Sequence, residues 1–126
     1  MPRPPRKPVD PLARVIDAEA VNRTLAVLGG KWTIPIVATL LGGTHRFTPL
    51  SAAVGPASPK VLVRRLRALE AEGLVTRVLY PEIPPRVEYS LTPAGETLAP
   101  IIAAIEAWGI TARSPNGTEE HPPTVE

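Results

Sequence analysis

The stretch from Ser58 to Gly73 constrains the fold most strongly, because its pattern fits one amphipathic helix with both ends marked. Ser58 can cap the first free N–H groups, and Pro59 suits the first helical position. Gly73 suits a left-handed residue after the last turn. We therefore expect a helix over these residues.

The two sides of this helix differ in chemistry. At about 100° per residue, leucines and cations fall on opposite stripes. The apolar stripe holds Leu62, Leu66 and Leu69, and the cationic stripe holds Lys60, Arg64 and Arg67. The first stripe can pack on a scaffold while the second faces a polyanion, although a merely solvated basic face is the common alternative.

Length and composition limit the rest of the chain. Its 126 residues suit one domain, and its 44% apolar but only 4% aromatic content predicts an aliphatic core. The net charge of +2 is too small for a global electrostatic argument about nucleic acid. The sequence contains no cysteine, which excludes disulfides, thiolate nucleophiles and thiol-based redox sensing in these residues.

The two ends are expected to be unstructured. We predict a flexible, basic, proline-rich arm over residues 1–16, which is either functional or an untidy terminus, and a disordered acidic tail over residues 114–126. The folded domain then covers residues 17–113. No apolar run approaches the roughly 20 residues that a membrane span needs, so we expect a soluble, cytoplasmic protein.

Two helices are predicted before the basic one. The first begins at Asp17 and is closed by Gly29 and Gly30. The second covers residues 31–41 and is apolar nearly all round, as a central buried helix is. Pro35 complicates its start, so either Thr33 caps a helix that begins late or the start is kinked.

A short third helix leads into the basic one. Thr48 is expected to cap it, Pro49 to open it and Gly55 to close it, before a tight turn over residues 55–57. Two short helices joined by such a turn, the second being cationic, form the helix-turn-helix layout.

A hairpin is predicted next, with strands over residues 74–80 and 87–91 and a proline-rich loop over residues 81–86. After a recognition helix such a hairpin is a wing, and Arg86 at its tip could enter a minor groove. A plain surface hairpin is the alternative.

The last predicted helix follows a Thr92 cap and continues to about Ala112, with a bend before Pro100. Its long apolar stripe exceeds what the domain core needs, so we expect a second copy of the chain to cover it. The fold class is thus mainly α with a small antiparallel β-hairpin, a winged helix-turn-helix with a long C-terminal helix, in a dimer.

No catalytic or metal site is apparent. The residues around Gly30 and Lys31 lack the spacing of a phosphate loop. His45 and His121 are far apart in sequence and have no carboxylate cluster beside them. We expect no enzyme activity, no cofactor and no metal.

The order of these elements, with their residues, resembles the HxlR-type branch of the MarR-like winged-helix transcription regulators. The matching residues are Leu28–Trp32, Arg46–Phe47 with Leu50, Ser58, Lys60, Leu62, Leu66–Glu70 with Gly73–Val75, Tyr80–Tyr89, Leu91–Thr92 with Gly95, and Trp108–Gly109.

The resemblance implies a bacterial, cytoplasmic homodimer that reads a palindromic operator in double-stranded DNA. It implies DNA contacts from Arg46, Ser58, Pro59, Lys60, Val63, Arg64, Arg67 and Arg86. It implies a dimer interface from Val21, Leu25, Leu98, Ile101, Ile102, Ile105 and Trp108. Many members of the family look to carry a sensing cysteine before the first helix, where this chain has residues 11–14 without a thiol.

A rival hypothesis is an effector- or protein-binding module, which could coexist with DNA binding. Helices 1 and 2 and the last helix would enclose a pocket for a small-molecule effector, lined by Trp32 and Trp108. Core or dimer filling is the plainer explanation of both tryptophans.

Overall fold

The predicted helices and hairpin are present in the computed structural model of the chain, which describes residues 16–113. The predicted arm (except Ile16) and the tail lie outside the described residues. The elements are α1 (Ala18–Leu28), α2 (Thr33–Leu41), β1 (His45–Arg46), α3 (Phe47–Val54), α4 (Pro59–Ala71), β2 (Val75–Tyr80), β3 (Arg86–Leu91), α5 (Pro93–Glu96) and α6 (Ala99–Arg113).

The sheet contains one strand more than the predicted hairpin. Its order is β1-β3-β2, and both pairings are antiparallel. The added strand β1 has two residues, and it pairs Arg46 with Glu88 and His45 with Tyr89. So short a strand has no periodicity of its own, and only its partner reveals it.

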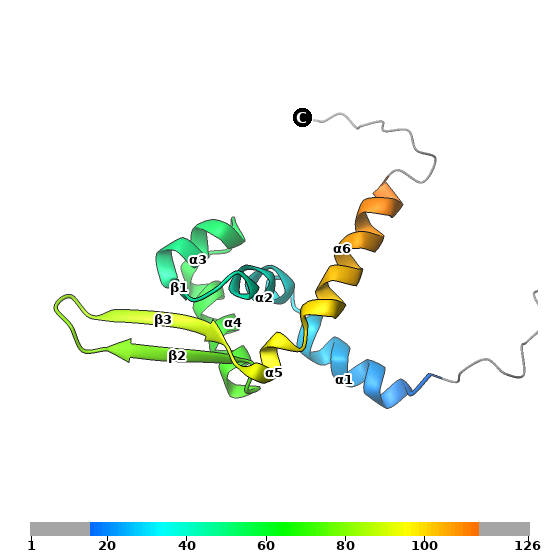
Figure 1. The fold of residues 1–126 in the computed structure, drawn as a ribbon, viewed down its shortest axis with the longest axis horizontal. Helices are drawn as coiled ribbons and strands as arrows, with labels where there is room; N and C mark the ends of the chain where they lie inside the picture. Colours follow the sequence, from blue (N-terminus) through cyan, green and yellow to red (C-terminus); the bar gives the residue numbers. More distant parts are fainter. Residues whose placement is uncertain (1–15, 114–126) are drawn as a thin grey trace, which may run out of the picture.

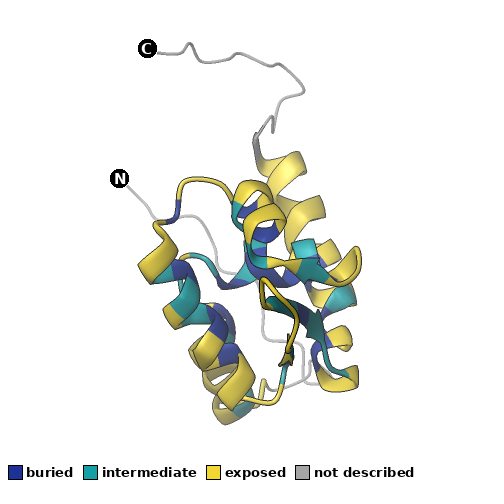
Figure 2. Cartoon of the chain, turned by 90° about the vertical axis from the view of Figure 1, so that its left-hand side faces the viewer, coloured by how far each residue is buried: buried dark blue, intermediate teal, exposed yellow. Residues whose placement is uncertain are grey.

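The core lies where α2, α3 and α4 meet the sheet, and Figure 2 shows the buried residues gathered there. It is aliphatic, as the composition predicts. Its fully buried large side chains include Ile36 from α2, Leu50 from α3, and Leu62, Leu66 and Leu69 from α4. In Figure 1 the β2–β3 hairpin projects to one side of this body, and α6 extends away on the other.

Two predicted helix caps are wrong, and the reason is the same in both. Helix α2 begins at Thr33 with Trp32 as its cap, and α3 begins at Phe47 with Arg46 as its cap. Neither Thr33 nor Thr48 therefore caps a helix. The prolines occupy the third helical position of each, where the backbone N–H has no intrahelical partner anyway. Consequently Pro35 requires no kink.

The predicted bend before the last helix is present as a complete break. Helix α5 begins as predicted, because the Thr92 hydroxyl accepts a hydrogen bond from the Gly95 N–H at 3.0 Å. Two residues then separate α5 from α6, and Pro100 lies in the first turn of α6. The same Thr92 hydroxyl donates to the Gly73 carbonyl at 2.6 Å, which fastens α5 to the end of α4.

Candidate nucleic-acid interface

Helix α4 begins and ends as its sequence predicts. The Ser58 hydroxyl accepts a hydrogen bond from the Val61 N–H at 3.2 Å, and Pro59 is the first helical residue. Gly73, two residues beyond the last turn, has φ = +78°, a conformation in which a Cβ is strained. Glycine here lets the chain turn sharply into β2.

The leucine stripe of α4 is buried, and the predicted contact residues lie outside the core. Ser58, Pro59, Lys60, Arg64 and Arg67 are exposed, and Val63 is half-buried. Within residues 16–113 both ion pairs belong to Arg86, so none of the α4 cations is neutralised by a carboxylate. This side of α4 therefore presents free positive charge and unpaired donors.

The helix before α4 sets its position. Leu50 and Val54 of α3 are core residues, and Gly55 turns the chain with φ = +106°. The buried Ala57 then leads directly into the Ser58 cap. Because both helices are anchored in one core, the cationic side of α4 is held in a fixed orientation.

The wing places Arg86 differently from the sequence prediction. Arg86 is the first residue of β3, directly opposite Tyr80, and not the last residue of a loop. Its guanidinium lies 2.7 Å from a Glu82 carboxylate oxygen and 2.6 Å from a Glu88 carboxylate oxygen. It also lies over the Tyr80 ring, 3.9 Å from the centroid. The charge predicted to face DNA is thus engaged within the wing.

The ion pairs of the wing change the acidity of both partners. The hydrogen bond from Arg86 lowers the pKa of the Glu82 carboxyl below its usual range. The same hydrogen bond raises the pKa of Arg86. Both shifts favour the charged pair over its neutral alternative.

Arg46 lies beside the wing and is exposed. It is the β1 residue opposite Glu88, and it lines an open groove of about 480 Å³ between the start of α3 and the wing residues Pro85 and Val87. Unlike Arg86, it has no ion-pair partner among residues 16–113.

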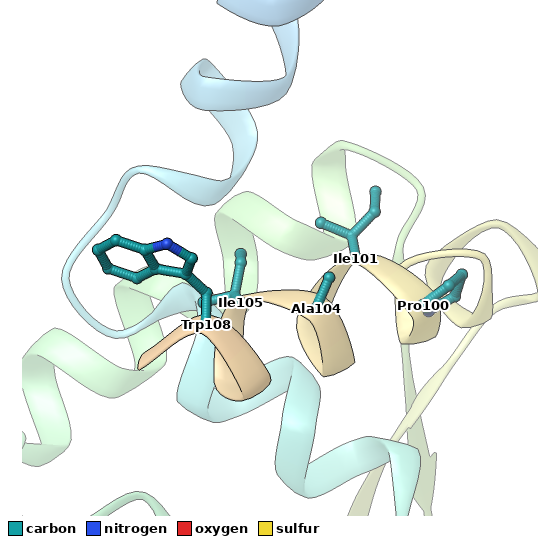
Figure 3. Close-up of a pocket in the computed structure, with 5 residues that line it drawn as sticks. All are labelled: Pro100, Ile101, Ala104, Ile105 and Trp108. Atoms are coloured by element: carbon teal, nitrogen blue, oxygen red, sulfur yellow. The ribbon is translucent and has the colours of Figure 1, made fainter. Parts of the chain in front are cut away.

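The residues predicted for a dimer interface divide into two groups. Val21, Leu25, Ile101, Ile105 and Trp108 are exposed, Trp108 at 74%. Figure 3 shows Ile101, Ile105 and Trp108 projecting along one side of α6, where they line an open groove of about 540 Å³ with Pro100 and Ala104.

The second group lies in the core of the chain itself. Leu98 and Ile102 are buried at 9% and 8% exposure. A side chain already covered by its own chain offers little surface to a partner, so we expect Leu98 and Ile102 to contribute less to an interface than the exposed group. Leu98 directly precedes α6 and Ile102 lies in its first turn, and both belong to the core of the domain.

The two tryptophans are not brought together in one pocket. Trp32 is half-buried against the core, with the Lys31 ammonium 5.1 Å from its ring centroid. Every residue lining the Trp108 groove belongs to α6. A separate groove of about 220 Å³ lies between α1 and the α5–α6 junction, lined in part by Arg23, Glu72 and Thr97.

The sequence reasoning missed two residues that the structure makes prominent. Arg65 of α4 lies against Gly30, where an added Cβ would come within 2.8 Å of its guanidinium carbon. The Gly29-Gly30 pair predicts the end of a helix, and that local signal does not indicate the approach of a side chain from α4. The other residue is Ile83 at the wing tip, which is fully exposed.

Other classes of site have no support in residues 16–113. This part of the chain holds no group of three His, Cys, Asp or Glu residues able to bind a metal ion. No single described helix has the length and hydropathy to cross a bilayer; α1 and α2 meet those criteria only when combined across an 80° bend.

Comparison with known proteins places these features in one family. Residues 27–116 match the model of a family described as HxlR-like helix-turn-helix. The HTH-type transcriptional regulator YtfH of Escherichia coli K12 is 45% identical over 78 residues, which are 62% of this chain and 62% of YtfH. The HTH-type regulator YvaP of Bacillus subtilis 168 is 44% identical over 69% of this chain and 81% of its own.

Solved structures show the same fold. A transcriptional regulator of the MarR family from Porphyromonas gingivalis W83 superposes with a TM-score of 0.72 and 38% identity, covering 78% of this chain and 97% of that one. The redox regulator HypR in its oxidized form gives a TM-score of 0.69 with 39% identity, covering 73% and 95%.

Proposed function

Because this chain belongs to the HxlR-like helix-turn-helix family, we infer that it is a transcriptional regulator that binds double-stranded DNA as a homodimer. The observation that carries this inference is the unpaired cationic side of α4, held on a buried leucine stripe. Helix α4 lies in a major groove, with its N-terminal residues nearest the base edges. Such a regulator works in the cytoplasm, where bacterial DNA lies, and needs no catalytic activity.

The contacts divide by role. Lys60 and Arg64 are placed to reach base edges or phosphates from the first turns of α4, together with Ser58, Pro59 and Val63. Arg67 lies about one turn further along, and Arg46 beside the wing suits a phosphate. All are half-buried or exposed.

The dimer is proposed from the apolar residues that the chain leaves uncovered. Ile101, Ile105 and Trp108 follow the spacing of one helical face, and Val21 and Leu25 do the same on α1. Large exposed apolar patches on a protein of this size mark interaction sites. A two-fold dimer requires an operator with half-sites about one helical turn apart.

Selection of bound duplexes from a random DNA pool tests the function directly. We expect a palindrome, and Arg64→Ala should weaken binding to it by about 1–3 kcal/mol if Arg64 contacts a base. Arg23→Ala is the matched control, because it removes one exposed cation from α1. Enrichment of no motif by the wild-type protein would refute DNA reading, and equal losses in both variants would reduce the role of α4 to nonspecific charge.

A small-molecule effector is a second candidate, and the groove between α1 and the α5–α6 junction favours it. It joins the proposed dimer helices to the end of α4, so a ligand there can couple the two. Ala94 also lines this groove, so Ala94→Leu should fill it and abolish the metabolite-induced loss of DNA binding measured by fluorescence anisotropy. A response that persists in this variant would place the ligand elsewhere.

A further inference from the structure

All the charges at the wing tip are engaged with one another. Arg86 bridges Glu82 and Glu88 at 2.7 and 2.6 Å, and its other contact is the face of Tyr80. Two carboxylates against one guanidinium leave the tip with one formal negative charge. The tip itself therefore offers no free cation to a phosphate.

A phosphate contact by Arg86 would compete with these pairs for the same guanidinium. Charge-assisted hydrogen bonds are about twice as strong as neutral ones, and Arg86 makes three of them. Its side chain is only 27% exposed. Releasing it would also leave Glu82 and Glu88 facing the DNA without a counterion.

What the tip does present is apolar. Ile83 is fully exposed, and Pro81, Pro84 and Pro85 around it have fixed φ angles. A hydrogen bond from the Glu82 N–H to the Tyr80 carbonyl at 2.8 Å closes the turn just before it. The Ile83 side chain is thus held outward on a stiff loop. In water, this large aliphatic group contributes no stability to the fold.

We propose that the wing contacts the DNA minor groove through Ile83, and that Arg86 is a positioning residue that holds the tip by bridging Glu82 and Glu88. The proposal rests on the DNA-binding function inferred above. Aliphatic side chains are frequently inserted into minor grooves, where they pack on sugars or between base steps. Such a contact reads the shape and deformability of the groove.

The position of the wing favours DNA as the occupant. Only Glu72, Gly73 and Leu74 separate α4 from β2, and α4 packs against that strand. A duplex that lies on α4 therefore also passes close to the wing. Arg46 opposite Glu88 supplies the unpaired cation beside the tip, so a phosphate contact there does not need Arg86.

The first test replaces the apolar tip. Ile83→Ser should weaken operator binding about tenfold while leaving the salt dependence unchanged, because no charge is lost. Hydroxyl-radical footprinting should show loss of protected sugars outside the half-sites. Leu79→Ser changes an exposed apolar residue of the same hairpin that lies within β2, outside the proline-rich loop, and as the matched control it should retain the affinity and the footprint.

The second test separates positioning from contact. Arg86→Gln leaves the two carboxylates unbalanced and should weaken binding. A triple variant, E82Q/R86Q/E88Q, has no charge to balance and should recover most of the affinity with the wild-type salt slope. A phosphate-contacting Arg86 predicts the opposite, namely no recovery and a slope lowered by about one.

The outcomes distinguish this proposal from the function beneath it. A wild-type protein that selects no DNA motif would defeat both. A wild-type protein that selects one, while Ile83→Ser keeps its affinity and footprint, would overturn the tip contact alone and leave Ile83 for a protein partner. Equal losses in Ile83→Ser and Leu79→Ser would overturn the assignment to the tip.

Discussion

At the scale of single residues, Thr33 is the one buried polar side chain of residues 16–113 whose hydroxyl has no hydrogen-bond partner. It is fully buried at the start of α2, where it does not act as a cap. An unsatisfied buried hydroxyl carries its desolvation cost without compensation. The core therefore tolerates Thr33 for its shape, not for its polarity.

Thr33→Val should accordingly raise the free energy of unfolding by about 1 kcal/mol, because valine has the same shape without the orphan hydroxyl. Chemical denaturation measures this change. Thr39→Val is the control, since the Thr39 hydroxyl donates to the Pro35 carbonyl at 2.8 Å and its loss should not stabilise the protein. A destabilised Thr33→Val would mean that the hydroxyl has a partner in solution.

Gly95 is required for a close approach between α5 and the start of the hairpin. A Cβ at this position would collide with the backbone carbonyl oxygen of Leu74, which also accepts the Thr92 N–H. We expect Gly95→Ala to lower the free energy of unfolding by about 1–3 kcal/mol. Gly109→Ala on α6 meets open space, so it should leave stability unchanged or raise it. Equal thermal unfolding of the two variants would contradict this account.

At the scale of elements, the wing is held by side chains that lie on one face of the sheet. Tyr80, Arg86 and Glu88 share this face through the β2–β3 register, and Arg46 joins it through β1. Positive and negative side chains alternate on this face, and the attraction between them stiffens the hairpin. Its stiffness should therefore depend on pH.

The direction of that dependence follows from Glu82. Arg86 lowers the pKa of Glu82 in the folded state, so the stabilisation is present above the ordinary carboxyl pKa and is lost as the pH falls through the lowered value. An NMR titration of the Glu82 carboxyl carbon should show the lowered pKa, and Arg86→Gln should return it towards the ordinary value. An identical titration curve in both proteins would exclude the ion pair in solution.

At the scale of the whole molecule, α6 extends from the domain with its start packed into the core and one apolar side exposed. Leu98 and Ile102 anchor its start in the core, while Ile101, Ile105 and Trp108 face outward. Figure 2 shows its projecting part exposed almost throughout. A helix of this kind gains stability only when another apolar surface covers it.

Ile105→Asp should convert the proposed dimer into a monomer at micromolar concentration, because a dimer would bury the new carboxylate without a counterion. Light scattering measures the mass, and Trp108 emission should shift towards that of a solvated indole. Ala103→Asp, on the other side of α6, adds the same charge and should remain dimeric. A monomeric wild-type protein would remove α6 from the interface.

The absence of cysteine bears on how such a regulator could be switched. HypR, a structural relative, is a redox regulator, yet these 126 residues contain no thiol. Thiol oxidation within this chain therefore cannot provide the signal. A small molecule bound in the groove beside α1, as proposed above, is the alternative signal.

The sequence by itself determined the elements whose signals are local. The Ser58 and Thr92 caps, the leucine stripe of α4, the hairpin and the break before α6 all follow from residues within a few positions of one another. Their physics is short-ranged: a cap bonds to the next turn, and periodicity defines a buried face.

Only the tertiary structure decided what depends on distant partners. It buried Leu98 and Ile102 but left Ile105 outward, and it added β1, which exists only through β3. It also paired Arg86 with two carboxylates, whereas the sequence alone is equally consistent with a free cation at the end of a loop. Burial and ion pairing are set by which elements meet in space, and periodicity along one element does not contain that information.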